Sequence, residues 1–123
     1  MATVMVVDDE PVTRETVRTV LESEGYRIVE ASNADDCWKK IQSSPPDLIL
    51  LDIRMPGTPA VDLIKKIKES SKLRHIKIVY LTAIAGTKEV AKRLEGVVGT
   101  IEKPFKSKEL VAMVKKALSH IVI

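Results

Sequence analysis

Short apolar runs rich in β-branched residues recur along the chain, and more polar stretches separate them. The apolar positions within each run are consecutive rather than alternating, which is typical of strands buried on both faces of a parallel sheet. We therefore predict one strand at each run. The runs are Val4–Val7, Arg27–Glu30, Leu48–Leu51, Ile76–Leu81 and Val97–Ile101.

Between these runs, apolar residues repeat every three or four positions, which is the spacing of one face of an amphipathic helix. Each stripe predicts a helix that follows one of the strands. The stripes are Val17, Val20 and Leu21; Ala34, Cys37 or Trp38, and Ile41; Ala60, Leu63, Ile64 and Ile67; Val90, Ala91 and Leu94; and Leu110, Val111, Val114, Ala117, Leu118 and Ile121.

Residues with strong local preferences mark the expected helix ends. Pro11 suits a helix start, and Gly25 suits a helix stop. Asn33 is a candidate N-cap for the second helix, which the Pro45-Pro46 pair would end. Ser107 is expected to cap the last helix.

Strands that alternate with helices predict a doubly wound α/β fold. Such a fold has one parallel sheet with helices on both faces, and the strand order 2-1-3-4-5 accommodates five strands. A chain of 123 residues has the size of a single domain.

Composition narrows the classes of function. The single cysteine, Cys37, excludes an internal disulfide framework and a thiolate zinc site, and it suits a reducing compartment. No apolar run approaches the ~20 residues of a membrane span, so we expect a cytoplasmic protein without a membrane partner. The net charge of +3 is mildly basic, and pairs such as Lys39-Lys40 lack interleaved aromatic residues. We therefore expect no direct binding of nucleic acid.

Polar side chains gather where the predicted strands end, which is the edge at which doubly wound sheets bind ligands. The second strand, expected at the edge of the sheet, ends in the bland sequence Glu30-Ala31-Ser32. The other four strands end in or near Asp8-Asp9-Glu10, Asp52, Thr82 and Lys103. Acidic residues at such positions often only cap helices, but that reading leaves Lys103 unexplained.

Electrostatics suggests what these side chains hold. Two carboxylates ~4 Å apart repel each other by roughly 4 kcal/mol at an effective dielectric constant of about 20. Lys103 supplies one positive charge, and a divalent cation would supply the rest. His75 and His120 fall outside the cluster, and oxygen-only ligands favour a hard cation such as Mg²⁺. Asp52 is then the best candidate for a nucleophile that accepts a phosphoryl group, with Lys103 and Mg²⁺ neutralising the transferred oxygens.

Four stretches of the sequence resemble the signatures of response-regulator receiver domains, in order and at the proper spacing. They are VVDDE at 6–10, LLDIRMPG at 50–57, LTA at 81–83 and EKPF at 102–105. The resemblance covers essentially the whole chain. It implies a flavodoxin-like fold and transfer of a phosphoryl group from the phosphohistidine of a sensor histidine kinase or a histidine phosphotransfer protein.

Carried over by position, the resemblance assigns a role to each polar residue. Asp52 would be the phosphorylated residue, and Asp8, Asp9, Asp52 and the backbone carbonyl of Arg54 would bind Mg²⁺. The Thr82 hydroxyl would turn toward the phosphoryl group, and Lys103 would form an ion pair with it. The resemblance also implies a cis peptide bond between Lys103 and Pro104.

Receivers usually carry an aromatic switch residue three positions before the site lysine, and this chain has Thr100 there. A smaller side chain would therefore have to transmit the signal. We expect phosphorylation to shift a conformational equilibrium at a signalling face that includes Lys88, Lys92, Thr100 and Lys106. The downstream protein or output domain is unknown, and the sequence leaves open a phosphorylation-dependent homodimer.

We expect residues 1–123 to be a single receiver domain without an output domain, either standing alone or part of a longer regulator. Two alternatives belong to other classes. The first is a protein-binding module that keeps the fold but works without phosphorylation. The second is a Mg²⁺-dependent phosphatase with an aspartyl nucleophile. Those enzymes resemble a pattern with two aspartates separated by one residue, whereas Asp8 and Asp9 are adjacent.

Two further positions predict a long-lived aspartyl phosphate. In the family, the residues two after the phosphorylated aspartate and two after the threonine line the approach of the attacking water; they are Arg54 and Ile84 here. An apolar Ile84 cannot orient water. Loss of the phosphoryl group, followed by mass spectrometry without a phosphatase, should therefore be slow. A half-life of seconds at room temperature would contradict this prediction.

Overall fold

The structure is a computed structural model of the chain, and it describes residues 2–54, 57–82 and 97–119. The predicted fourth helix, with Val90, Ala91 and Leu94, lies outside these residues, as does Ile121 at the end of the last stripe. Within the described residues, no helix is long and apolar enough to cross a membrane.

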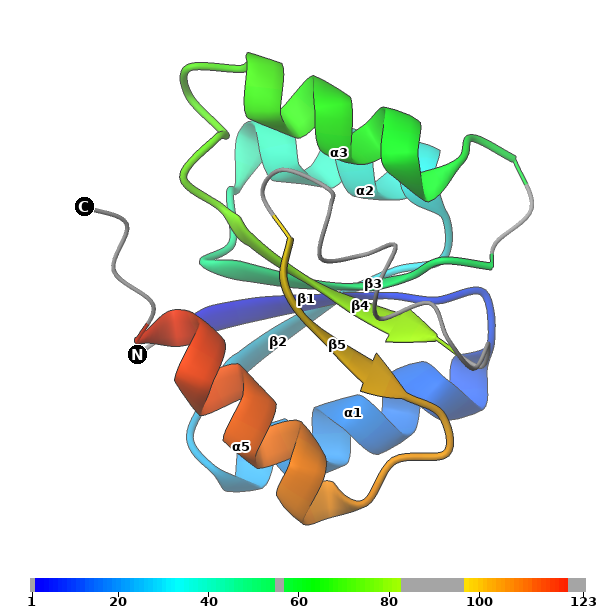
Figure 1. Cartoon of the computed structure of the whole chain (residues 1–123), viewed down its shortest axis with the longest axis vertical. Coiled ribbons are helices and arrows are strands. Elements are labelled where there is room, and N and C mark those ends of the chain that lie inside the picture. The colour runs from blue at the N-terminus through cyan, green and yellow to red at the C-terminus, as the bar shows by residue number, and fades with distance from the viewer. Residues whose placement is uncertain (1, 55–56, 83–96, 120–123) are drawn as a thin grey trace.

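A five-stranded parallel sheet forms the centre of the molecule, with the predicted order β2-β1-β3-β4-β5 (Figure 1). Each strand starts and ends within one residue of its predicted bounds. Ile76 lies just before its strand, where its N–H donates to the Leu73 carbonyl (3.0 Å) in a turn. The strands are β1 (Thr3–Val7), β2 (Arg27–Ala31), β3 (Leu48–Asp52), β4 (Lys77–Thr82) and β5 (Val97–Glu102).

Helices cover both faces of the sheet, which confirms the doubly wound, flavodoxin-like architecture. Figure 1 shows α1 and α5 on one face and α2 and α3 on the other. The described helices are α1 (Pro11–Ser23), α2 (Ala34–Ser43), α3 (Ala60–Glu69) and α5 (Ser107–Leu118).

The consecutive apolar residues of the strands feed two separate cores. In β3, Leu48 and Leu50 pack with the core under α1 and α5, whereas Ile49 and Leu51 pack with the core under α2 and α3. Successive side chains of a strand point to opposite faces, so a strand covered on both sides needs apolar residues at every position. This requirement explains why the runs do not alternate.

Local signals at the helix ends are mostly confirmed. Gly25 follows α1 with a φ of +91°, a conformation that glycine adopts at little steric cost. The Asn33 side chain accepts a hydrogen bond from the Asp36 N–H (2.7 Å) and caps α2. The prediction that Ser107 caps the last helix is wrong. Lys106 is the N-cap, Ser107 is the first helical residue, and the Glu109 carboxylate accepts the Lys106 N–H (3.4 Å). That carboxylate makes a capping side chain at Ser107 unnecessary.

Cys37 and Trp38 belong to the core under α2 and α3. Cys37 is fully buried, and burial raises the pKa of its thiol to about 12. Trp38 is half-buried against the same core, and the Lys66 ammonium lies 5.3 Å from its ring centroid. Both residues therefore have structural surroundings rather than those of a reactive thiol or a base-stacking platform.

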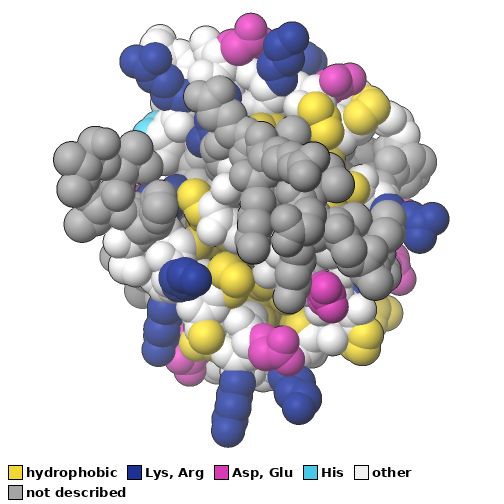
Figure 2. Space-filling view, in the orientation of Figure 1, with side chains coloured by type: hydrophobic (Ala, Val, Ile, Leu, Met, Phe, Trp, Pro, Cys, Tyr) yellow, Lys and Arg dark blue, Asp and Glu magenta, His cyan; other side chains and the backbone are white. Residues whose placement is uncertain are grey.

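Charged side chains of both signs are interspersed on the face of the molecule that Figure 2 shows. On the face shown in Figure 2, the described lysines and arginines project from top to bottom and alternate with acidic side chains. The described basic pairs Lys39-Lys40, Lys65-Lys66 and Lys115-Lys116 are all exposed.

Candidate functional site

The carboxyl ends of four neighbouring strands build the site. Asp8 directly follows β1, Asp52 is the last residue of β3, Thr82 is the last residue of β4, and Lys103 directly follows β5. The strands are parallel and in register, with Asp52 opposite Leu81 and Thr82 opposite Glu102. Their ends therefore meet at one edge of the sheet, which lies at the right of Figure 1.

The Lys103 ammonium joins the carboxylates of two different strands. Its Nζ lies 2.6 Å from Oδ2 of Asp8 and 3.3 Å from Oδ2 of Asp52, and it lies 3.7 Å from Oε1 of Glu10. Asp8 is fully buried and Asp52 is 3% exposed, so both carboxylates depend on protein groups to offset the loss of water.

Hydrogen bonds fix the second oxygen of each buried carboxylate. Oδ1 of Asp8 accepts the Glu10 N–H (2.9 Å), and Oδ1 of Asp52 accepts the Arg54 N–H (3.0 Å). Each carboxylate therefore contacts Lys103 through one oxygen and the turn after its own strand through the other. The Arg54 side chain is exposed, so the described link between Arg54 and Asp52 runs through the backbone.

The environment of Asp52 opposes its ionised form. Burial raises the pKa of Asp52, and the charge of Asp8 raises it further, although the Arg54 N–H and Lys103 oppose both effects. Burial by itself disfavours the Lys103 ammonium, but the hydrogen bonds and charges of Asp8 and Asp52 hold the pKa of Lys103 above its ordinary value. Lys103 is therefore a permanent cation beside these carboxylates at neutral pH.

The chain of β4 and β5 holds Lys103 in place. Its N–H donates to the Thr82 carbonyl (2.6 Å), which continues the β4–β5 pairing past the end of β5. The peptide bond between Lys103 and Pro104 is cis, as the resemblance to receiver domains implies. Thr82 is fully buried beside this link.

The turn after β1 offers ligands that fit Mg²⁺. Carboxylate oxygens of Asp8, Asp9 and Glu10 all lie within 4.8 Å of one another, and Asp9 and Glu10 are exposed. Two oxygens on opposite sides of a Mg²⁺ ion are about 4.2 Å apart, so small side-chain movements would bring these groups to ligand distance. Asp52 lies outside this group of three and is joined to Asp8 through Lys103.

The remaining predicted residues fall in different places. Thr100 is half-buried in β5 opposite Tyr80, and Lys106 is exposed at the start of α5. Ile84, Lys88 and Lys92 lie outside the described residues. The described part of the predicted signalling face therefore consists of Thr100 in β5 and Lys106 at the start of α5.

Sequence reasoning missed four residues near the site. It included Glu10 in a motif but assigned it no role, although Glu10 joins the acidic group and contacts Lys103. It treated Glu30 as bland, whereas Glu30 forms ion pairs with two arginines of α1, one of which is Arg14. The spacing of those arginines, four residues apart on one helix face, was the signal that could have found this contact.

Replacing Asp52 with asparagine tests the electrostatic cost of the site. Because the folded protein raises the pKa of Asp52, its charge opposes folding above that pKa and the cost disappears as pH falls. Asp52→Asn should raise the midpoint of thermal unfolding by several degrees at pH 7 in Mg²⁺-free buffer. The gain should shrink toward pH ~4, near the ordinary pKa of aspartate.

Asp62→Asn is the matched control, since Asp62 is exposed in the first turn of α3. Thermal unfolding followed by circular dichroism should show no gain for that variant. A lower midpoint for Asp52→Asn at pH 7 would contradict the electrostatic account.

Comparisons with known proteins give the chain its family. The model of the response regulator receiver domain matches residues 4–115. The phosphate regulon transcriptional regulatory protein PhoB of Escherichia coli strain K12 is 40% identical over 119 residues, which are 96% of this chain and 52% of PhoB. The chain thus spans about half the length of the curated relatives that it matches.

Solved structures agree with this match. A putative response regulator of Chloroflexus aurantiacus superposes with a TM-score of 0.89 at 26% identity, covering 97% of this chain and 98% of that one. The response regulator TrrA of Thermotoga maritima, solved in complex with Mg(2+)-BeF, has a TM-score of 0.83 at 35% identity, covering 95% of this chain and 99% of TrrA. The chain belongs to the receiver domains of response regulators, the signalling modules of two-component systems.

Proposed function

We propose that this receiver accepts a phosphoryl group on Asp52 from a phosphohistidine donor, with Mg²⁺ bound at the adjacent acidic turn, and that the modification switches a partner. The donor would be a sensor histidine kinase or a histidine phosphotransfer protein. The partner would be a downstream protein or an output domain. In this function the chain is a signalling phosphoacceptor that acts on itself rather than on a free metabolite.

The contact of Lys103 with both Asp8 and Asp52 carries the proposal. A cation held at a buried carboxylate neutralises negative charge there, and the same cation would neutralise the oxygens of an arriving phosphoryl group. An ion pair that only stabilised the fold would not need an ammonium shared between two strand ends. Here both carboxylates also raise the pKa of that ammonium.

The transfer step balances without a further reactant. An Asp52 carboxylate oxygen attacks phosphorus, an oxygen–phosphorus bond forms, and the phosphorus–nitrogen bond of the phosphohistidine breaks. The electron pair of that bond returns to the imidazole, which takes up a proton from water, so a neutral histidine leaves. The product is an aspartyl phosphate on this chain.

Each neighbour of Asp52 has a separate task in this proposal. The Arg54 N–H holds one carboxylate oxygen, which fixes the direction of the other. Asp8, Asp9, Asp52 and the Arg54 carbonyl would hold Mg²⁺, and Glu10 is a further candidate because its carboxylate belongs to the same group. When bound, Mg²⁺ supplies positive charge for the phosphoryl oxygens. The solved complex of TrrA with Mg(2+)-BeF supports this ion.

The switch would pass from Thr82 to the face formed by β5 and the start of α5. The Thr82 hydroxyl would turn toward the phosphoryl group, and the equilibrium between two arrangements would shift toward the phosphorylated one. Thr100 takes the place of a bulky switch residue on β5, and its half-buried position leaves it in reach of both the sheet and the surface. Lys106 extends this face on the solvent side.

Labelling with a small acyl phosphate tests the proposal directly. The chain should gain the mass of one phosphoryl group in the presence of Mg²⁺, and the adduct should be stable in acid and labile in base. Asp52→Asn should abolish the gain, because an amide cannot form the acyl phosphate. Intact-mass spectrometry with peptide mapping measures both results.

Asp47→Asn supplies the matched control at the opposite end of β3. Asp47 precedes the strand, and its carboxylate accepts the Thr3 N–H (2.8 Å), which asparagine can also do. That variant should be phosphorylated like the parent chain. A parent chain that takes no label with Mg²⁺ would instead favour a binding module that works without phosphorylation.

A further inference from the structure

Arg14 of α1 reaches across to the end of β1 and holds the backbone of the acidic turn. Its Nη1 donates to the Asp8 carbonyl (2.7 Å), and its own N–H donates to the Glu10 carbonyl (3.2 Å). The Arg14 side chain is 19% exposed, so its guanidinium lies mostly inside the protein. The Arg14 side chain therefore holds the start of the Asp8–Glu10 turn, and the first backbone bond of α1 holds its end.

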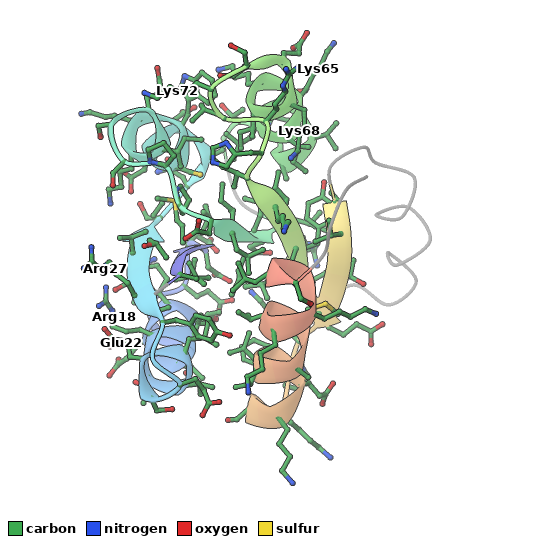
Figure 3. The ribbon with its side chains drawn as sticks, turned by 90° about the vertical axis from the view of Figure 1, so that its left-hand side faces the viewer. Arg18, Glu22, Arg27, Lys65, Lys68 and Lys72 are labelled. Carbon is green, nitrogen blue, oxygen red and sulfur yellow. The ribbon has the colours of Figure 1, made fainter. Side chains whose placement is uncertain are left out.

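Glu30 of β2 sets the orientation of this guanidinium. Oε1 of Glu30 accepts a hydrogen bond from Nε of Arg14 (3.1 Å). Oε2 accepts one from Nε of Arg18 (2.8 Å) and lies 2.7 Å from Nη2 of the same arginine. Each carboxylate oxygen thus takes one arginine. The planar guanidinium offers donors in a fixed fork, so a bond at Nε fixes where Nη1 points. Arg18 also forms an ion pair with Glu22 on the same helix (3.3 Å), and both residues are labelled in Figure 3.

Strand β2 thereby controls both peptide groups of Asp8. The Asp8 N–H donates directly to the Ala31 carbonyl of β2 (3.1 Å). The Asp8 carbonyl is held indirectly, through Arg14 and Glu30. A peptide group fixed on both sides leaves little freedom to the side chains that follow, which are those of Asp9 and Glu10.

We propose that Arg14, oriented by Glu30, is a positioning residue that holds the Asp8–Glu10 turn in the arrangement that binds Mg²⁺. This inference rests on the proposed function, because it names how the metal side of that site is kept in shape. Arg14 touches neither the phosphoryl group nor the ion, and its effect passes through the backbone of the turn. Mutation of groups that orient metal ligands typically lowers metal affinity 10–100-fold.

The charge of Arg14 and its positioning role have opposite effects on Mg²⁺ affinity, so an affinity measurement can separate them. A guanidinium beside a cation site repels the cation, so charge alone predicts that removing Arg14 tightens Mg²⁺ binding. Positioning predicts that removing Arg14 weakens it. The sign of the change separates the two effects.

Calorimetric titration with Mg²⁺, without a phosphodonor, measures the affinity. Arg14→Met should weaken Mg²⁺ binding about tenfold. Arg14→Lys keeps the charge but loses the planar fork in which the Nε bond to Glu30 directs Nη1 at the Asp8 carbonyl, so it should also weaken binding. Glu30→Gln keeps both arginines but replaces the charged acceptor that orients them with a neutral one. It should therefore weaken Mg²⁺ binding by a smaller factor, about threefold. Circular dichroism at the titration temperature checks that each variant is folded.

Arg27→Met is the matched control. Arg27 is exposed at the start of β2 (Figure 3), so this substitution removes the same charge at a distance from the turn. Its Mg²⁺ affinity should equal that of the parent chain. Tighter or unchanged Mg²⁺ binding in Arg14→Met would overturn the positioning role, and so would parent-like affinity in Arg14→Lys. If Arg14→Met does not fold, unchanged affinity in Glu30→Gln overturns it. A parent chain that binds no Mg²⁺ at all would overturn the proposed function itself.

Discussion

One ammonium held between two buried carboxylates is the interaction on which the rest of this receiver depends. Asp8 and Asp52 end neighbouring parallel strands, and Lys103 contacts both. Parallel strands bring their carboxyl ends to one edge, so the fold itself forces the two acids together. Without the ammonium, both buried carboxylates would lose the positive charge that compensates them.

The two aliphatic cores offset the electrostatic cost of this arrangement. Fully buried residues such as Leu50 and Leu51 pack on opposite faces of β3, immediately before Asp52. Burial of such side chains stabilises the fold by roughly 1.5–3 kcal/mol each, which offsets the cost of like charges at the strand ends. The rigid sheet thus fixes Asp52, and the turns at its edge carry the adaptable groups, Asp9 and Glu10.

The sequence could predict those parts of the structure that follow from local rules. The consecutive apolar runs placed the strands within one residue, and the strand-end rule brought Asp8, Asp52 and Lys103 to one edge. The sequence could not predict the contacts that long side chains of the helices make with other elements. The spacing of Arg14 and Arg18 marks one helix face, but the partner of that face depends on how α1 packs over β2. Helix α5 also begins one residue earlier than the sequence predicts, with Lys106 as the N-cap and Glu109 accepting the Lys106 N–H.

A crystal structure with Mg²⁺ and beryllofluoride, which mimics a phosphoryl group, tests the central claim most directly. The account predicts beryllofluoride on the Asp52 carboxylate, Lys103 Nζ within about 3 Å of one of its fluorines, and the ion against the Asp8–Glu10 turn. Beryllofluoride bound at another residue, or a Lys103 side chain turned toward solvent with the mimic in place, would contradict it.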